Sequence, residues 1–300
     1  MVYCKIQINF VPIYNNLDDY NMFFNDTTII TNNITMPKLA LGTWCMSAQE
    51  AAESVKYALK IGYRHIDTAL AYSNEEGVSQ GILNSGIDRA QIFVTTKIPA
   101  EVKSVEGAIQ SIKTSLKNLN IGYIDLLLIH APMPWNEIRG AKRYFKENLD
   151  VWGVMEKFYA EGTVKAIGVS NFKNDDLDNI IRNSEIPPMV NQIKVHPGSS
   201  AAVTLKGTLS RNITAMAYSP LGHGKTLSNP FILQLAQKYN VSPAQLCIKY
   251  VLQKGCCPVV KSSNHTHIES NANLDFTIND DDIKFLSCLG TIKNLKKHKL

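Results

Sequence analysis

Short apolar runs rich in β-branched residues alternate with longer amphipathic runs from Lys38 onward. Unbroken or alternating apolarity predicts a strand, whereas apolar residues three or four positions apart predict a helix. Strands are predicted over residues 39–41, 64–67, 92–97, 125–130, 166–170, 190–194, 214–218 and 257–260. Helices are predicted to follow these strands over residues 48–60, 75–83, 104–118, 147–160, 175–181, 201–209, 230–239 and 266–272. Two extra helices are predicted over residues 243–253 and 280–289.

Residues 124–129, in the fourth predicted strand, are all apolar except Asp125. Both faces of this strand are therefore apolar, as expected for a strand that is covered on both sides. A single closed (β/α)8 barrel, or TIM barrel, is the simplest fold for this order of elements. An open doubly wound sheet is the alternative. Its phosphate-binding signature, G-x-G-x-x-G after the first strand, is absent, because that strand is followed by Gly42-Thr43-Trp44-Cys45.

The two ends of the chain differ from the repeating part. Residues 1–26 have no clear hydrophobic period, and we treat them as an N-terminal extension of unassigned order. The run 27–36 reads as strand, Asn-Asn turn and strand, which predicts a short hairpin ahead of the barrel. The barrel is expected to cover residues 27–290, followed by a basic C-terminal tail over residues 291–300.

Composition narrows the class of protein. The chain has 300 residues, 45% of them hydrophobic, and a formal net charge of +5. We therefore expect one soluble globular domain, a solvated tail and no binding of nucleic acid. No apolar run approaches a membrane span and the N-terminus is a poor targeting signal, so we expect a cytoplasmic protein without membrane contact. The six cysteines lack metal-site spacing, and the absence of heptads favours a monomer.

Polar residues close the predicted strands, and barrel enzymes carry their chemistry at those carboxyl ends. Asp67 ends the second strand and Tyr72 follows it in the next loop. Lys97 and His130 end the third and fourth strands. Each residue also has an ordinary interpretation, since a strand-end Asp is often a cap and a lone His often belongs to the core. Their convergence on one rim favours a shared site.

Five segments of the sequence resemble the aldo-keto reductase family. They are residues 62–69, 123–130, 167–172, 191–192 and 217–222, and they occur in the same order as in the family. The resemblance runs from about Thr27 to Leu289 and is closest to the microbial and protist diketogluconate reductase-like or aldose reductase-like branch. It implies a barrel enzyme in which a reduced nicotinamide cofactor passes a hydride to a carbonyl carbon.

The family's catalytic tetrad matches Asp67, Tyr72, Lys97 and His130. The resemblance implies that Tyr72 protonates the carbonyl oxygen while His130 donates a hydrogen bond to it. A free tyrosine has a pKa near 10, so we expect a neighbouring Lys97 cation to lower the pKa of Tyr72. Asp67 is expected to keep Lys97 charged and oriented.

The resemblance also implies contacts along the whole cofactor, although Ser170-Asn171 could equally be a turn and Tyr218 a core aromatic. The expected contacts of the nicotinamide, its carboxamide and its ribose are Ser170, Asn171, Gln192, Tyr218 and Thr43. The expected contacts of the pyrophosphate and adenosine are Ser219, Leu221, Lys261, Ser262 and Asn271.

The sequence departs from the family at the adenosine end. His267 stands where an Arg usually clamps the 2'-phosphate of NADP, and Ser270 replaces a usual Gln or Glu. A neutral histidine cannot make the planar two-pronged contact of Arg with a phosphate. We expect NADPH as the cofactor because Lys261 and Ser262 remain, with weaker discrimination against NADH.

A second departure lies in the substrate pocket, which is expected to include Trp44, Tyr72, His130, Ala131 and Trp135. Ala131 replaces a usual tryptophan after the fourth strand, and Trp135 is expected to replace it in part. With a short C-terminus as well, the resemblance implies an open site for several small aldehydes and ketones. The alternative function is a cofactor-binding regulatory or auxiliary subunit on the same barrel.

Overall fold

The computed structural model describes residues 26–31, 34–137, 140–199 and 201–297. The extension predicted over residues 1–26 lies outside this range except for Asp26, and so does the Asn-Asn turn of the hairpin. Within the described ranges, none of the helices combines the length and apolar character that a membrane crossing requires.

Eight parallel strands close into a barrel whose order around the axis follows the chain, with the last strand paired to the first. They are β3 (Ala40–Gly42), β4 (His65–Asp67), β5 (Phe93–Ile98), β6 (Leu126–Ile129), β7 (Ile167–Ser170), β8 (Val190–Lys194), β9 (Thr214–Tyr218) and β10 (Cys256–Lys261). The predicted TIM barrel is confirmed. The strands are buried along nearly their whole length because helices cover them outside and facing strands fill them inside.

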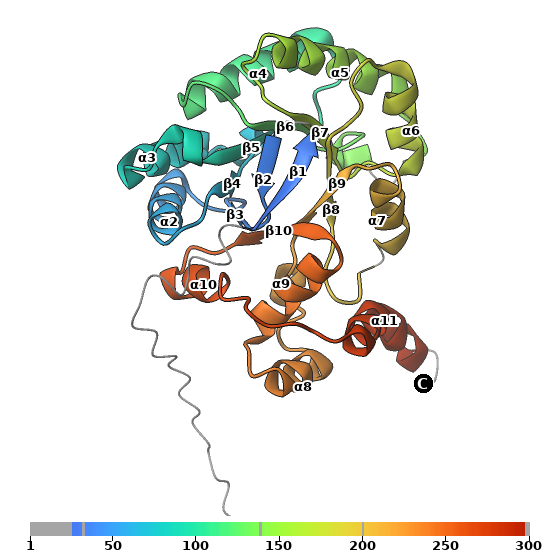
Figure 1. The fold of residues 1–300 in the computed structure, drawn as a ribbon. Helices are drawn as coiled ribbons and strands as arrows, with labels where there is room; N and C mark the ends of the chain where they lie inside the picture. Colours follow the sequence, from blue (N-terminus) through green and yellow to red (C-terminus); the bar gives the residue numbers. More distant parts are fainter. Residues whose placement is uncertain (1–25, 32–33, 138–139, 200, 298–300) are drawn as a thin grey trace, which may run out of the picture.

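The helices surround the strands in Figure 1. They are α2 (Ala48–Lys60), α3 (Glu75–Ser85), α4 (Val105–Leu119), α5 (Phe145–Ala160), α6 (Asn174–Asn183), α7 (Ala202–Leu209), α8 (Pro230–Lys238), α9 (Pro243–Gln253), α10 (His265–Ser270) and α11 (Asp280–Lys297). Four short 3-10 helices were not predicted: η1 (Leu70–Tyr72), η2 (Arg89–Gln91), η3 (Trp135–Glu137) and η4 (Gly222–Gly224).

Local capping residues fix where several helices begin. Ser47 and Glu50 form a capping box at the start of α2, and Ser242 forms one with Gln245 at the start of α9, ahead of Pro243 at the first helical position. Each box makes two hydrogen bonds from backbone N–H groups to side chains, and these satisfy donors that the first turn of the helix leaves free. The C-terminal helix α11 continues to Lys297, past its predicted end at residue 289.

The predicted hairpin forms from β1 (Thr27–Thr31) and β2 (Ile34–Pro37), which pair antiparallel. In Figure 1 it lies across one end of the barrel. Met36 is completely buried there, and the Pro37 carbonyl oxygen lies 3.0 Å from Nδ1 of His65 in the second barrel strand. The hairpin therefore covers the amino-terminal end of the barrel and leaves the carboxyl ends of the strands for a site.

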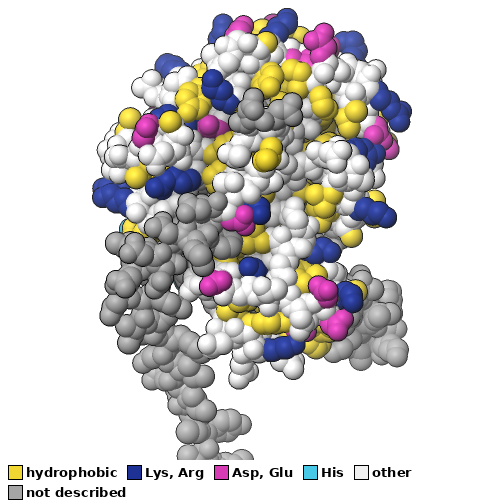
Figure 2. Space-filling view, in the orientation of Figure 1, with side chains coloured by type: hydrophobic (Ala, Val, Ile, Leu, Met, Phe, Trp, Pro, Cys, Tyr) yellow, Lys and Arg dark blue, Asp and Glu magenta, His cyan; other side chains and the backbone are white. Residues whose placement is uncertain are grey.

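The surface on the hairpin side carries mixed charge. In Figure 2, Lys and Arg side chains lie interspersed with Asp and Glu over the helices around the hairpin. Such interspersed charge is typical of a solvated surface and is consistent with the small net charge of the chain.

Candidate active site

A cavity of about 1000 Å³ opens at the carboxyl ends of the barrel strands. Its wall includes Asp67 from β4, His130 after β6, Gln192 from β8 and Tyr218 from β9, together with Tyr72 from η1. The closed barrel brings these residues together although 151 positions separate the first from the last along the chain (218 − 67). This is the edge at which barrel enzymes build their active sites.

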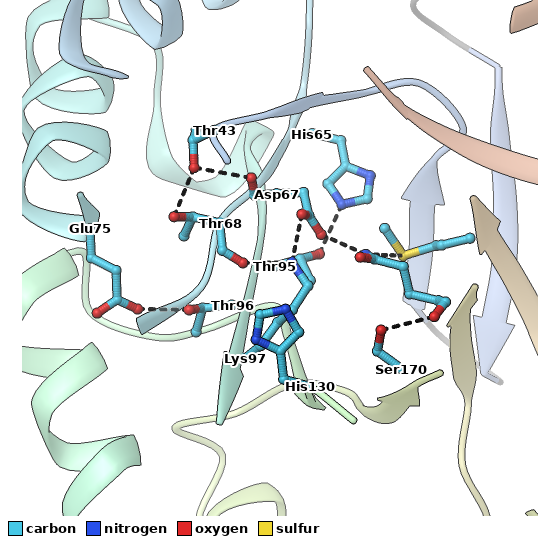
Figure 3. A network of polar contacts seen from close by, with 12 residues as sticks. Thr43, His65, Asp67, Thr68, Glu75, Thr95, Thr96, Lys97, His130 and Ser170 are labelled. Carbon is cyan, nitrogen blue, oxygen red and sulfur yellow. Dashed lines mark hydrogen bonds and ion pairs between the residues drawn. The ribbon is translucent and has the colours of Figure 1, made fainter. Parts of the chain in front are cut away.

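A buried ion pair lies at the base of the cavity (Figure 3). Nζ of Lys97 lies 2.6 Å from Oδ1 of Asp67, and both residues are at most 2% exposed. The same ammonium donates to the Thr68 carbonyl oxygen at 2.7 Å. Burial lowers the pKa of Lys97, and the Asp67 carboxylate opposes that shift. The carboxylate is thus the partner that makes a charged lysine tolerable at this depth.

The second oxygen of Asp67 is also engaged. Nε2 of Gln192 donates to Oδ2 of Asp67 at 2.7 Å, and the Ser170 hydroxyl donates to the backbone carbonyl oxygen of Gln192 at 2.9 Å. Figure 3 shows this chain of contacts crossing from Asp67 to Ser170. Gln192 therefore stands beside the ion pair, and it also forms part of the cavity wall.

His130 is held between two aromatic rings. Its imidazole makes edge contacts with Tyr72 at 5.6 Å and with Trp135 at 5.3 Å between ring centroids. Burial, with a smaller effect of the Lys97 charge, lowers the pKa of His130 to about 3. The imidazole is consequently neutral at ordinary pH, with one ring nitrogen as donor and the other as acceptor. Its buried Nδ1 has no hydrogen-bond partner among the residues that the structure describes.

Tyr72 differs from the sequence-based expectation. Burial raises its pKa, and the Asp67 carboxylate raises it further. Nζ of Lys97 lies 5.2 Å from the centroid of the phenol ring, but its hydrogen bonds go to Asp67 and Thr68. The pKa of Tyr72 is therefore raised, not lowered as predicted, because burial penalises the phenolate and the Asp67 carboxylate adds to that penalty. Tyr72 stays protonated.

Asn171 links the neighbouring strand ends. Its Nδ2 donates to the His130 carbonyl oxygen and to the Ser170 hydroxyl, both at 3.0 Å, and its Oδ1 accepts from the Tyr218 hydroxyl at 2.8 Å. Its φ of 63° lies in the left-handed region, which asparagine tolerates better than most residues. Burial and then Tyr72 raise the pKa of Tyr218 to about 12, so this phenol also remains neutral.

Comparison with known proteins assigns the sequence to a family. The sequence model described as the aldo/keto reductase family matches residues 38–288. The chain belongs to the aldo-keto reductase family. It is accordingly an oxidoreductase that acts with a nicotinamide cofactor on carbonyl compounds.

Relatives in distant organisms cover nearly the whole chain. A 9,11-endoperoxide prostaglandin H2 reductase from Trypanosoma cruzi is 37% identical over 280 residues, which is 92% of this chain and 95% of that protein. A glyoxal reductase from Bacillus subtilis is 38% identical over 266 residues, 88% of this chain and 92% of that protein. The crystal structure of a Bombyx mori aldo-keto reductase in complex with NADP has a TM-score of 0.79 and 32% identity, covering 87% of this chain and 92% of that one.

The other predicted site residues of this aldo-keto reductase fall into two groups, those that line the cavity and those that do not. The residues that line the cavity are Trp44, Trp135, Ser170, Ser219, Leu221 and Lys261. Those outside the lining are Thr43, Ala131, Ser262, His267 and Asn271. Thr43 is completely buried, and its hydroxyl donates to Oγ1 of Thr68 at 2.9 Å. His267 is exposed on α10, and Ala131 is completely buried behind the wall.

Sequence reasoning missed several residues of the cavity wall. Cys45 and Ala71 line it as direct neighbours of predicted residues, so proximity along the chain could have identified them. Glu101 and His223 also line it, and no pattern in the sequence marks either. His223 of η4 makes an edge contact with Trp44 at 5.5 Å between ring centroids, so two loops meet at the cavity mouth.

The cavity suits a nicotinamide nucleotide in size and in chemistry. Side-chain amides of Asn171 and Gln192 offer both donors and acceptors, and Tyr218 offers a flat aromatic surface. Lys261 provides a cation at another part of the wall. Within the described part of the chain, no group of three His, Cys, Asp or Glu side chains is arranged to hold a metal ion.

Proposed function

We propose that the enzyme reduces aldehydes and ketones to alcohols with NADPH, with Tyr72 as the proton donor and broad specificity for small carbonyls. The observation that carries this proposal is the cluster at the cavity base. A buried Lys97–Asp67 ion pair lies beneath the ring of Tyr72, and Tyr72 contacts the neutral imidazole of His130. A protonated phenol and a neutral imidazole are the two donors that a developing alkoxide needs.

Each group of the cluster has a separate part in the proposal. The phenol of Tyr72 keeps its proton until the carbonyl oxygen becomes basic enough to take it. His130 donates its N–H to the same oxygen, and the charge of Lys97, 5.2 Å from the ring centroid, would partly offset the burial penalty of the phenolate that remains. Asp67 holds Lys97 in place. NADPH, when bound, supplies the hydride.

Cofactor binding in the proposal follows the residues of the cavity. Asn171, Gln192 and Ser170 would hold the carboxamide, and Tyr218 would pack against the nicotinamide ring. Ser219 and Leu221 would bind near the pyrophosphate. Lys261, Ser262, His267 and Asn271 would bind the adenosine end, and the histidine there makes NADH an accepted second cofactor.

The substrate class follows from the outer part of the cavity. Trp44 and Trp135 line it and are 49% and 41% exposed, so an aromatic but open rim faces solvent. Such a rim offers apolar contact without a closed shape, which favours several small carbonyls over one bulky ligand. The glyoxal reductase name of one relative agrees with this class.

The decisive experiment measures NADPH oxidation with a panel of small aldehydes for the wild type and for Tyr72→Phe. We expect the variant to bind NADPH normally and to lose at least about a hundredfold in kcat. Tyr159→Phe on α5 is the matched control, because it removes a phenol oxygen away from the cavity lining. Cofactor binding without turnover in the wild type, or an unchanged kcat in Tyr72→Phe, would contradict the proposal.

A further inference from the structure

Three consecutive backbone carbonyls after β6 each accept a hydrogen bond from a side chain. The His130 carbonyl accepts from Nδ2 of Asn171 at 3.0 Å, and the Ala131 carbonyl accepts from Nζ of Lys103 at 2.9 Å. The Pro132 carbonyl accepts from Nδ2 of Asn148 at 2.8 Å. The three donors come from the end of β7, the loop before α4 and the helix α5.

These hydrogen bonds hold a segment that lies outside the helices and strands. Residues 131–134 belong to no helix or strand, yet Ala131 and Pro132 are buried. A buried carbonyl without a hydrogen-bond partner is energetically costly. Side chains therefore supply the hydrogen-bond donors that a neighbouring strand or helix turn would otherwise supply. The His130 N–H continues the barrel pattern by donating to the Ile98 carbonyl oxygen at 3.0 Å. Beyond that bond, the three side chains hold the carbonyls of residues 130–132, and the Pro134 carbonyl accepts from the Glu137 N–H at 2.9 Å.

Lys103 and Asn148 work as one unit. Nζ of Lys103 also donates to Oδ1 of Asn148 at 2.9 Å. The side-chain amide of Asn148 thus accepts a hydrogen bond from Lys103 and donates one to the Pro132 carbonyl oxygen. Asn148 is 2% exposed. Burial lowers the pKa of Lys103 to about 8, while the carboxylates of Glu101, Glu147 and Asp176 favour its charged form. A charged donor makes the stronger hydrogen bond, and removing either residue takes away the bond between them as well as one bond to the backbone.

We propose that Lys103 and Asn148 are positioning residues that set the orientation of the His130 imidazole by holding the backbone of residues 131–132. This inference rests on the proposed function, in which His130 donates to the carbonyl oxygen. Edge contacts with Tyr72 and Trp135 confine the ring, but they do not set the path of the backbone that carries it. Small displacements of a donor reduce catalysis strongly, which gives such a clamp a function.

The test compares Lys103→Met and Asn148→Leu, which remove the polar groups at similar volume, with Lys113→Met as the control. Lys113 is an exposed lysine on α4. We expect kcat to fall about tenfold in both clamp variants, with the Kd for NADPH changing less than about twofold. The double variant should lose little more than either single one, because the two residues share one set of bonds. Lys103→Arg keeps a charged donor and should recover part of the rate.

A readout independent of turnover is the NMR signal of the His130 imidazole. We expect it to shift in Lys103→Met and Asn148→Leu and to stay unchanged in Lys113→Met. Wild-type kcat and an unshifted imidazole in folded clamp variants would overturn the positioning role. An equal loss of NADPH affinity and kcat would also overturn it, since that result indicates general damage. An inactive wild type would contradict the proposed function instead, and the imidazole signal would still test the clamp.

Discussion

Gln192 donates a hydrogen bond from Nε2 to Oδ2 of Asp67 at 2.7 Å, from the strand on the opposite side of the barrel. The carboxylate that pairs with Lys97 is therefore held from two directions. Both of its oxygens are engaged, one by the ammonium and one by the amide. The ion pair and the cavity wall thus form one polar unit, and a change at Asp67 acts on both.

Removing the charge of Asp67 should destabilise the protein. Asp67→Asn keeps the size of the side chain but leaves Lys97 buried without a counter-charge. We expect the free energy of unfolding, measured with urea, to fall by about 3 kcal/mol, as for other broken buried pairs. Asp275→Asn is the control, since Asp275 is exposed. Equal stability of the two variants would show that Lys97 does not depend on this carboxylate.

Acid should destabilise the protein through His65. This completely buried ring contacts the Pro37 carbonyl oxygen and Oγ1 of Thr95, and burial lowers its pKa to about 4. The unfolded chain, with a histidine pKa near 6.5, binds the proton first, so stability is lost as pH falls from about 6.5 to about 4. The loss should approach about 3 kcal/mol at pH 4.

The measurement for His65 is urea unfolding at a series of pH values. His65→Asn removes the titrating ring, so its stability should vary less over the same window than that of the wild type. The comparison cancels the titration of other groups, including His130. Parallel curves for the two proteins would contradict the assignment to His65.

Two helical glycines should respond in opposite ways to alanine. A Cβ at Gly77 of α3 would lie 2.0 Å from the Ala48 carbonyl oxygen of α2, whereas a Cβ at Gly153 of α5 would meet no atom within 4 Å. We expect Gly77→Ala to lower the free energy of unfolding by about 1–3 kcal/mol through overpacking. Gly153→Ala should raise it by up to about 1 kcal/mol through helix propensity. The same sign for both would contradict the close approach of α2 and α3.

Cofactor preference should change with His267→Arg. The planar guanidinium can bind a phosphate with two hydrogen bonds, so kcat/KM for NADPH relative to NADH should rise about tenfold, or about 1.4 kcal/mol. Thr266→Arg adds the same charge one position away and is the control. An equal rise in both variants would indicate a long-range charge effect. A wild-type preference near a thousandfold would contradict weak discrimination at this site.

Much of this molecule can be predicted from local pattern. The eight strand runs and the helical runs between them predict buried parallel strands covered by helices, and the missing G-x-G-x-x-G signature favours a closed barrel over an open sheet. The hairpin is equally visible in its β-branched runs around Asn32-Asn33. The end of α11 at Lys297 could not be predicted in this way, because helix ends depend more on capping and on contacts than on the hydrophobic period.

The site divides in the same way. The residue types at strand ends brought Asp67, Lys97, His130 and Tyr72 into one prediction, and the structure places all four at one cavity or directly beneath it. Tertiary structure alone decided that Gln192 reaches Asp67 across the barrel. It also decided the direction of the Tyr72 pKa shift, and the contact of Lys103 with Ala131 and Asn148. The hydrophobic period and the motifs of the sequence predict which residues face the core. Hydrogen bonds and desolvation depend on distances between strands, and only the closed barrel sets those distances.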